Sequence, residues 1–290
     1  MRNSESFGNE ICQDESVRNH NRVRLRKQGW RHQLGRFRRV VGRRLSGVKL
    51  YLPNEVFSDD VYLVSYPRSG NTWTRLLVGN YITEGNCTRN SVPDIVPDIH
   101  WGDRSVCDGL ARPRFIKSHV AYVPEYPKVV YISRDGRDVA VSYFYYYMRL
   151  ERIDEQTSFS SFLEEFNRGR VMFGSWSEHV NSWLDSDLED LLVVRYEDLK
   201  ADPKNELLRI VRFAGLPAAD HLADLAVERS TFETWQSSEK RTGGISGARM
   251  HARSGAAGQY QQLFSPEELT QFMDVHGPAM NRLGYADDGN

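Results

Sequence analysis

The chain has few cysteines, no long hydrophobic run and, over one stretch, no acidic residue. Its 290 residues include three cysteines, Cys12, Cys87 and Cys107, and none stands in a CxxC pair or at a Cys/His ligand spacing. This arrangement favours free thiols in a reducing compartment and argues against a zinc site. No run of about 18 apolar residues occurs, so we expect no transmembrane span. The N-terminus lacks an apolar segment after its charges, which argues against a secretory signal and favours a cytoplasmic location.

Acidic residues are missing from Ser16 to Leu50, where 12 arginines and lysines occur. Residues 1–50 carry a net charge of +9 and residues 51–290 carry −10. The apolar residues of the basic stretch fall on one stripe of a helix: Trp30, Leu34, Phe37, Val40, Val41 and Leu45. Residues 18–49 are therefore either a basic amphipathic helix that contacts an anionic membrane or a polyanion, or a docked helix or solvated tail. We predict a basic extension at 1–50, partly disordered or helical, followed by one domain at 51–286.

The remaining sequence alternates short apolar runs with stretches of helical periodicity. Strands are predicted at Val61–Ser65, Arg114–Lys117, Val129–Ser133 and Leu191–Val194. Helices are predicted at Gly70–Thr83, Asp138–Leu150, Phe159–Arg168, Ser175–Asp185, Leu222–Arg229, Ser265–Met280 and from Pro203 to Gly215, while residues 84–113 and 237–259 are predicted to be irregular. This alternation predicts an α/β fold of three layers, with a central parallel sheet, flanking helices and ligands at the carboxyl ends of the strands.

The segment after the first predicted strand has the pattern of a phosphate-binding turn. A strand, a glycine-containing turn and a helix direct free N–H groups and the positive end of the helix toward an anion. In the P-loop pattern GxxxxGK[ST], a lysine follows the second glycine. Here Gly70 and Thr72 fit, but Asn71 takes the place of the lysine and the nearby cation is Arg68. The turn therefore suits a nucleotide other than ATP–Mg²⁺, and a P-loop nucleotide or small-molecule kinase is the alternative.

The segment YPRSGNTW resembles the YPKSGTTW signature of sulfotransferases that use 3′-phosphoadenosine 5′-phosphosulfate (PAPS). The resemblance implies a P-loop-like fold in which the turn cradles the 5′-phosphate of the cofactor through Arg68, Ser69, Gly70, Asn71 and Thr72. It also implies a catalytic role for Arg68 beside the leaving phosphate. Arginine replaces the family lysine at this position, so it can neutralise the phosphate but stays protonated and cannot donate a proton.

Two further segments extend the resemblance toward the reacting groups. RDGRDVAVSY resembles the RxxxDxxxS segment of the family, which implies that Arg134 and Ser142 hold the 3′-phosphate. PRFIKSH resembles PRxxKTHLP, which implies that Lys117 and His119 flank the reacting centre. His119 would act as general base, and Lys117 would stabilise charge on the transferring sulfuryl group. A strand-end histidine bonded only to backbone is the alternative for His119.

The adenine pocket is the last part that the resemblance implies. RYEDL matches the family segment in which a tyrosine lies near the adenine, here Tyr196, with Trp73 on the opposite side. Phe232, in a segment similar to TSF, completes this aromatic pocket. RSGAAGQY is similar to RKGxxGDW, the loop that closes over the 3′-phosphate, and contributes Arg253 and Gly255, although Ser254 takes the place of a cation.

We therefore predict a PAPS-dependent sulfotransferase that moves a sulfuryl group to a hydroxyl of a small molecule or carbohydrate by in-line displacement. No metal is expected, because the arginines and Lys117 supply the positive charge. Aromatic residues at Tyr143–Tyr147 and the segment Asp98–Trp101 either line the acceptor pocket or belong to the core. A polyanion-binding protein that acts through its basic arm is a second alternative, whereas a nucleic-acid partner is not expected. The oligomeric state stays open.

Overall fold

The computed structural model describes residues 53–100, 104–231, 234 and 256–285. The basic extension, and with it the predicted contact with a membrane or a polyanion, lies outside these residues. So do three of the predicted cofactor-binding residues, Phe232, Arg253 and Gly255. Within the described residues, no helix is both long and apolar enough to span a membrane.

Four parallel strands form the centre of the domain, in the order β2-β1-β3-β4. They are β1 Val61–Ser65, β2 Phe115–Ser118, β3 Lys128–Ser133 and β4 Leu191–Arg195. Every pairing is parallel, and Val61 at the start of β1 is in register with Phe115 of β2 and Lys128 of β3. All four strands therefore end at the same edge of the sheet, and the chain turns back across β1 between β2 and β3. Ligands bind at such an edge in open α/β sheets.

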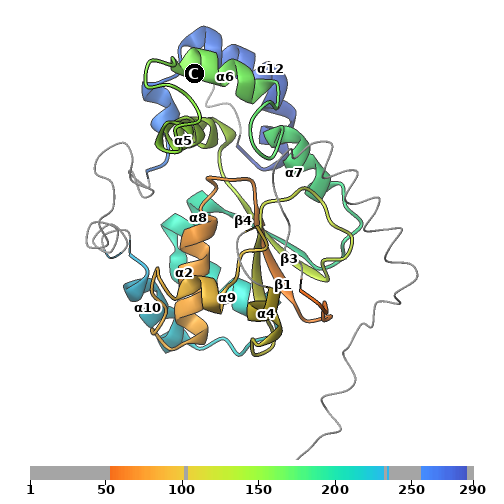
Figure 1. Ribbon diagram of the computed structural model, residues 1–290. Coiled ribbons are helices and arrows are strands. Elements are labelled where there is room, and N and C mark those ends of the chain that lie inside the picture. Colours follow the sequence, from red (N-terminus) through yellow and green to blue (C-terminus); the bar gives the residue numbers. More distant parts are fainter. Residues whose placement is uncertain (1–52, 101–103, 232–233, 235–255, 286–290) are drawn as a thin grey trace, which may run out of the picture.

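Helices cover both faces of this sheet and complete the predicted three layers (Figure 1). One face packs on α2 Asn71–Ile82, α8 Tyr196–Ala201, α9 Pro203–Phe213 and α10 Asp220–Arg229. The other packs on α5 Gly136–Arg149, α6 Phe159–Asn167, α7 Trp176–Leu184 and α12 Pro266–Arg282. Side chains of β1 alternate between the layers, since Val61 and Leu63 enter the first core and Tyr62 and Val64 the second. The predicted fold class is confirmed.

The segment predicted to be irregular at 84–113 contains two short helices, α3 Val92–Ile95 and α4 Arg104–Asp108. The prediction was wrong there because prolines were taken as breaks. Pro93 lies in the first turn of α3, where a helix tolerates the missing N–H. Helix α8, which follows β4 directly, was also missed, although Glu197 and Asp198 supply the acids that favour a first turn. A 3-10 turn, η3 Gln259–Gln262, precedes α12.

Candidate active site

Gly70 shapes the turn that joins β1 to α2. Its φ is 97°, in the left-handed region, and a Cβ placed on it would lie 2.5 Å from Cδ2 of Tyr196. Arg68 also has a left-handed backbone, with φ 74°. The hydroxyl of Ser69 is buried without a hydrogen-bond partner in the structure. The first N–H groups of α2, from Asn71 and Thr72, have no acceptor within the helix and are free for an anion.

The side chain of Asn71 turns toward β1 and secures the end of that strand. Its Nδ2 donates to the carbonyl of Leu63 at 2.9 Å and to Oγ of Ser65 at 3.2 Å. Asn71 thus occupies the place of the P-loop lysine without directing a cation at a ligand. This position can contribute to anion binding through its backbone N–H.

Arg68 is held against helix α5 rather than left pointing into solvent. Its Nε donates to Oγ of Ser142 at 3.1 Å, and its guanidinium lies 5.0 Å from the ring centroid of Tyr146. Arg149, which the sequence analysis did not single out, approaches the same ring at 4.9 Å. Burial, followed by the neighbouring charge of Arg149, lowers the pKa of Arg68 to about 10, so the group remains a cation at neutral pH. The structure thus pairs Ser142 with Arg68 of the turn after β1.

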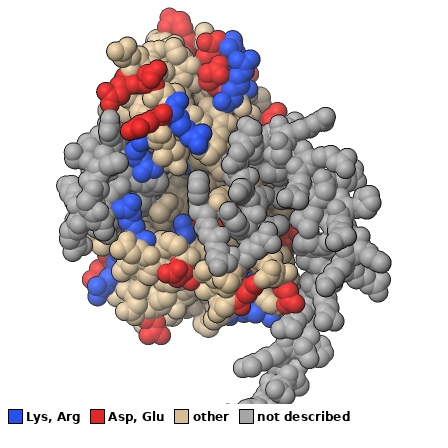
Figure 2. All heavy atoms as spheres, viewed as in Figure 1, with Lys and Arg blue, Asp and Glu red and all other residues tan. Residues whose placement is uncertain are grey.

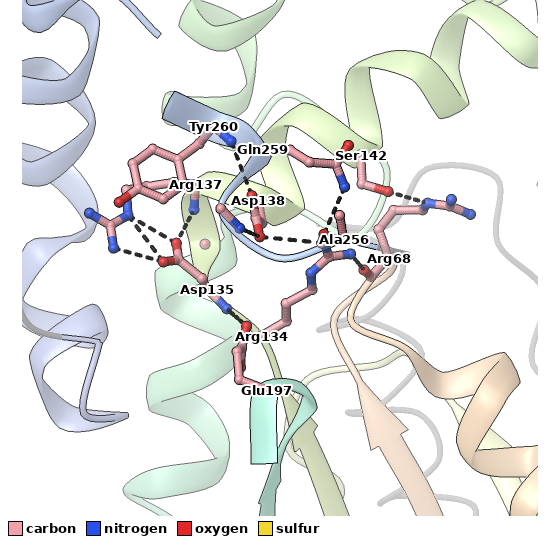
Figure 3. Close-up of polar contacts among 12 residues, drawn as sticks. Arg68, Arg134, Asp135, Arg137, Asp138, Ser142, Glu197, Ala256, Gln259 and Tyr260 are labelled. Atoms are coloured by element: carbon pink, nitrogen blue, oxygen red, sulfur yellow. Dashed lines mark hydrogen bonds and ion pairs between the residues drawn. The ribbon is translucent and has the colours of Figure 1, made fainter. Parts of the chain in front are cut away.

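Arg134, at the end of β3, lies at the centre of the polar network in Figure 3. Its guanidinium donates to the carbonyl of Ala256 at 2.9 Å and to the carbonyl of Arg68 at 3.3 Å. It also lies 3.5 Å from Oδ2 of Asp138 and 4.6 Å from the ring centroid of Tyr196. Arg134 is only 6% exposed, and its Nε has no hydrogen-bond partner in the structure. A buried donor of this kind fits a phosphate oxygen.

Asp138 connects helix α5 to the segment that follows the undescribed residues. Its two carboxylate oxygens accept the backbone N–H of Gly258 at 2.8 Å and of Tyr260 at 3.1 Å. The ring of Tyr260 in turn lies under the guanidinium of Arg137, 4.1 Å from centroid to Cζ. The acidic residue of the RxxxDxxxS segment therefore positions a loop, while Arg134 and Ser142 face the turn after β1.

Two aromatic rings from different elements border the turn, and they belong to the residues predicted to flank the adenine. Trp73 and Tyr196 meet edge to face, with ring centroids 6.0 Å apart. Nε1 of Trp73 donates to the carbonyl of Ser230 at 2.9 Å, which fixes the indole at the edge of the helix. Both rings are therefore oriented by contacts that do not need a ligand.

His119 follows the last residue of β2 and reaches across to the end of β1. Its Nδ1 lies 2.8 Å from the carbonyl oxygen of Ser65. A carbonyl only accepts, so Nδ1 carries the proton, and Nε2 keeps a lone pair that has no partner among the described residues. Burial first, and the charge of Lys117 second, place the pKa of His119 well below its usual value. The ring is therefore neutral at pH 7, as a general base must be.

Lys117 is buried in an ion pair that the sequence analysis did not anticipate. Its Nζ contacts Oδ2 of Asp98, and both side chains are about nine-tenths buried. Asp98 reaches this place because Pro97 and Ile99 hydrogen-bond to the backbone of Lys117, along the outer edge of β2. Burial lowers the pKa of Lys117, and the partner Asp98 opposes that shift. The resemblance implies that the positive charge of Lys117 stabilises the sulfuryl group. In the structure, the carboxylate of Asp98 already balances that positive charge.

The aromatic run of α5 divides between core and surface. Tyr143, Phe144 and Tyr147 are buried in the core that contains α6, whereas Tyr145 and Tyr146 are only partly buried. Tyr146, beside Arg68, reaches the candidate site, whereas Tyr143, Phe144 and Tyr147 belong to the core.

Cationic side chains are visible on part of one face of the molecule. In Figure 2 several lysines and arginines lie on the left at mid-height, while acidic side chains lie mainly toward the top and bottom, where further lysines and arginines also occur. Within the part of the chain that the structure describes, no group of three or more His, Cys, Asp or Glu side chains has the arrangement of a metal site. The charge and the partnerless donors of Ser69 and Arg134 fit a nucleotide that carries phosphates at two positions.

The sulfotransferase domain model matches residues 58–284 of this chain. The chain belongs to the sulfotransferase family. This confirms the resemblance seen in YPRSGNTW. Sulfotransferase 1A1 of Bos taurus is 34% identical over 196 residues, which cover 62% of this chain and 66% of that protein, just under two thirds of its length. Sulfotransferase 1E1 of Mus musculus is 26% identical over 242 residues, covering 75% of this chain and 82% of the relative.

Solved sulfotransferase structures share the fold. The mouse sulfotransferase SULT7A1, crystallised in complex with PAP, superposes on this chain with a TM-score of 0.60 at 26% identity. The superposition covers 79% of this chain and 85% of the SULT7A1 chain. Retinol dehydratase, in complex with androsterone and the inactive cofactor PAP, gives a TM-score of 0.63 at 23% identity, with 79% of this chain and 82% of that chain covered. The second likeness bears on the fold alone.

Proposed function

We propose that this sulfotransferase uses PAPS as its donor and a hydroxyl-bearing small molecule or carbohydrate as its acceptor. The observation that carries the proposal is the 2.8 Å contact between Nδ1 of His119 and the carbonyl of Ser65. This contact fixes a neutral imidazole, with Nε2 unprotonated, at the strand end from which the phosphate turn departs. A base and an anion cradle thus meet at one edge of the sheet.

The cofactor would be held from the ends of β1, β3 and β4. Backbone N–H groups at the start of α2, with Arg68 and Ser69, suit the 5′-phosphate, and Arg134 suits the 3′-phosphate. Trp73 and Tyr196 provide aromatic faces for the adenine. Arg253, Gly255 and Phe232 are proposed for the same cofactor on the resemblance alone. When bound, PAPS supplies the sulfuryl group that passes to the acceptor oxygen, while adenosine 3′,5′-bisphosphate leaves.

The residues of this chain perform the proton transfer and balance the charge. Nε2 of His119 takes the proton of the acceptor hydroxyl. Arg68, which keeps its positive charge, stabilises the negative charge that remains on the 5′-phosphate. Ser142 accepts a hydrogen bond from the Nε of Arg68 at 3.1 Å, which restrains the guanidinium. We propose that Lys117 stabilises charge near the reacting oxygens, with Asp98 setting its position.

Calorimetric titration with adenosine 3′,5′-bisphosphate, run without metal, tests the cofactor. We expect micromolar binding that is lost in Arg134→Ala, because a charge-assisted bidentate contact to phosphate disappears. Arg209→Ala, at an exposed arginine on α9, is the matched control and should bind normally. Binding of ADP–Mg²⁺ in place of the bisphosphate would overturn the proposal and restore the kinase alternative.

A further inference from the structure

His100 lies directly beside the candidate base. Its ring stacks on that of His119, with centroids 5.8 Å apart and planes within 11° of each other. The ring of Phe173 stands nearly perpendicular to both imidazoles, at centroid distances of 5.2 Å and 5.5 Å. His100 is only 3% exposed. Its imidazole is therefore a fixed part of the wall around the reacting centre.

The hydrogen bonding of His100 defines where its proton lies. Nε2 of His100 accepts the backbone N–H of His119 at 2.8 Å, so this nitrogen must carry a lone pair. Burial lowers the pKa of His100 to about 4, which keeps the ring neutral at pH 7. A neutral imidazole with its lone pair on Nε2 has its proton on Nδ1. His100 is thus a hydrogen-bond donor at Nδ1.

That donor has no partner in the structure. Nδ1 of His100 is fully buried and makes no hydrogen bond. The carboxylate of Asp98 is already engaged, since Oδ1 accepts the backbone N–H of His100 at 2.9 Å and Oδ2 pairs with Lys117. A buried donor without an acceptor destabilises a fold, and native proteins retain very few of them. A ligand atom that accepts a hydrogen bond would satisfy the Nδ1–H of His100.

We propose that Nδ1–H of His100 donates a hydrogen bond to an oxygen of the sulfated molecule, which makes His100 an acceptor-binding residue. This inference rests on the proposed function, since it names a contact within the same site. It assigns two separate roles to the ring, because Nε2 holds the backbone of His119 while Nδ1 holds the acceptor. Acceptors with an oxygen lone pair at this position are selected over those without one.

Two substitutions separate these roles. Asparagine at position 100 can place an amide N–H where Nδ1 lies, whereas glutamine reaches only the position of Nε2. We therefore expect His100→Gln to weaken acceptor binding about tenfold, and His100→Asn to stay within about threefold of the unchanged protein. The probe is 4-nitrophenol, titrated by calorimetry into the full chain saturated with adenosine 3′,5′-bisphosphate. Binding of the bisphosphate itself should be equal in all three proteins, which also shows that each is folded.

The outcomes distinguish this inference from the function on which it rests. Loss of bisphosphate binding in the unchanged protein would overturn the proposed function. If the bisphosphate binds and His100→Gln takes up 4-nitrophenol as well as the unchanged protein does, the role of His100 is overturned and the proposed function stands. Failure of the unchanged, bisphosphate-loaded protein to bind 4-nitrophenol would likewise overturn the role of His100. In the expected case, a ¹⁵N-resolved Nδ1–H signal that is absent in His100→Gln shifts when the probe binds.

Discussion

Gly70 satisfies two independent constraints, one from its backbone and one from a neighbouring ring. Its left-handed φ of 97° disfavours any residue with a Cβ, and Tyr196 fills the space that such an atom needs. Tyr196 is also the ring proposed to face the adenine. Loss of the glycine should therefore disturb the fold and, under the proposed function, the position of the cofactor.

Gly215 provides a control for the backbone constraint alone, since its φ is 80° and no atom lies within 4 Å of the place that a Cβ would take. Gly215→Ala should cost about 1–2 kcal/mol of unfolding free energy. Gly70→Ala should cost at least about 3 kcal/mol, because the collision with Tyr196 adds to the backbone strain. Urea denaturation of both variants measures the difference. Equal costs would show that Tyr196 moves aside freely.

His119→Ala should lower turnover about 10²- to 10⁴-fold, the range expected for loss of a general base. Bisphosphate affinity should be unchanged, since the residues proposed to bind the phosphates follow β1 and β3. The rate of the unchanged protein should stay level from pH 8 down to 6.5, because the pKa of His119 is well below its usual value and the ring loses its base function only on protonation at lower pH. Turnover near normal in His119→Ala would remove this residue from the mechanism.

Among the elements, helix α5 links two loops of the candidate site, namely the turn after β1 and the segment 256–260. Arg134 lies two residues before this helix. Asp138 and Ser142 lie on it four residues apart, which places these two side chains on one face. Asp138 reaches the segment 256–260, and Ser142 reaches the turn after β1. One helix therefore fixes the relative position of two loops that are far apart in sequence.

Asp138→Asn should release the segment 256–260 from α5. The amide retains one acceptor oxygen where two backbone N–H groups now bind, and it no longer pairs with Arg134. We expect amide exchange in a peptide spanning Gly258 and Tyr260 to speed up at least about tenfold, and the unfolding free energy to fall by about 2 kcal/mol. Glu164→Gln, at an exposed ion pair of α6, is the control. Unchanged exchange at Gly258 would show that other contacts hold the segment.

Much of this arrangement was predictable because it follows local periodicity. Arg134 directly follows β3 and Ser142 lies eight residues later on α5, while His119 directly follows β2, so these positions follow from the resemblance together with the strands and helices predicted around them. The pair of Asp98 and Lys117 does not, because it depends on a short segment that pairs with the outer edge of β2. The convergence of Arg149 and Arg68 on Tyr146 likewise depends on how the end of α5 packs against the turn. Contacts between elements carry no local signal.

Over the whole molecule, buried neutral histidines make stability depend on pH. Burial lowers the pKa of His100, His179 and His276 to about 4 in the folded protein. The unfolded chain binds these protons near pH 6.5, so between pH 6.5 and 4 it holds more protons than the folded chain. Stability is therefore complete above pH 6.5 and is lost as the pH falls below it.

His276→Phe should reduce this acid sensitivity. The side chain of His276 is fully buried among Phe166, Trp176 and Phe272, which suit another aromatic ring. Between pH 7 and pH 5 one such histidine accounts for about 2 kcal/mol of lost stability. The fall in unfolding free energy over this range should therefore be about 2 kcal/mol smaller in the variant than in the unchanged protein. Urea denaturation at both pH values gives the comparison. An equal loss in the two proteins would show that His276 is protonated in the fold.

The strip of backbone from Pro97 to Ile99 makes hydrogen bonds to the outer edge of β2, on the side away from β1. Exchange of this strip with its counterpart from another family member would leave the pairing of β1 with β2 and β3 in place. An exchange extended to His100 would replace Asp98 and His100 together, while the residues proposed to hold PAPS, at the ends of β1, β3 and β4, would keep their positions. Under the proposed function, such chimeric proteins should vary the choice of sulfuryl acceptor on an unchanged PAPS site.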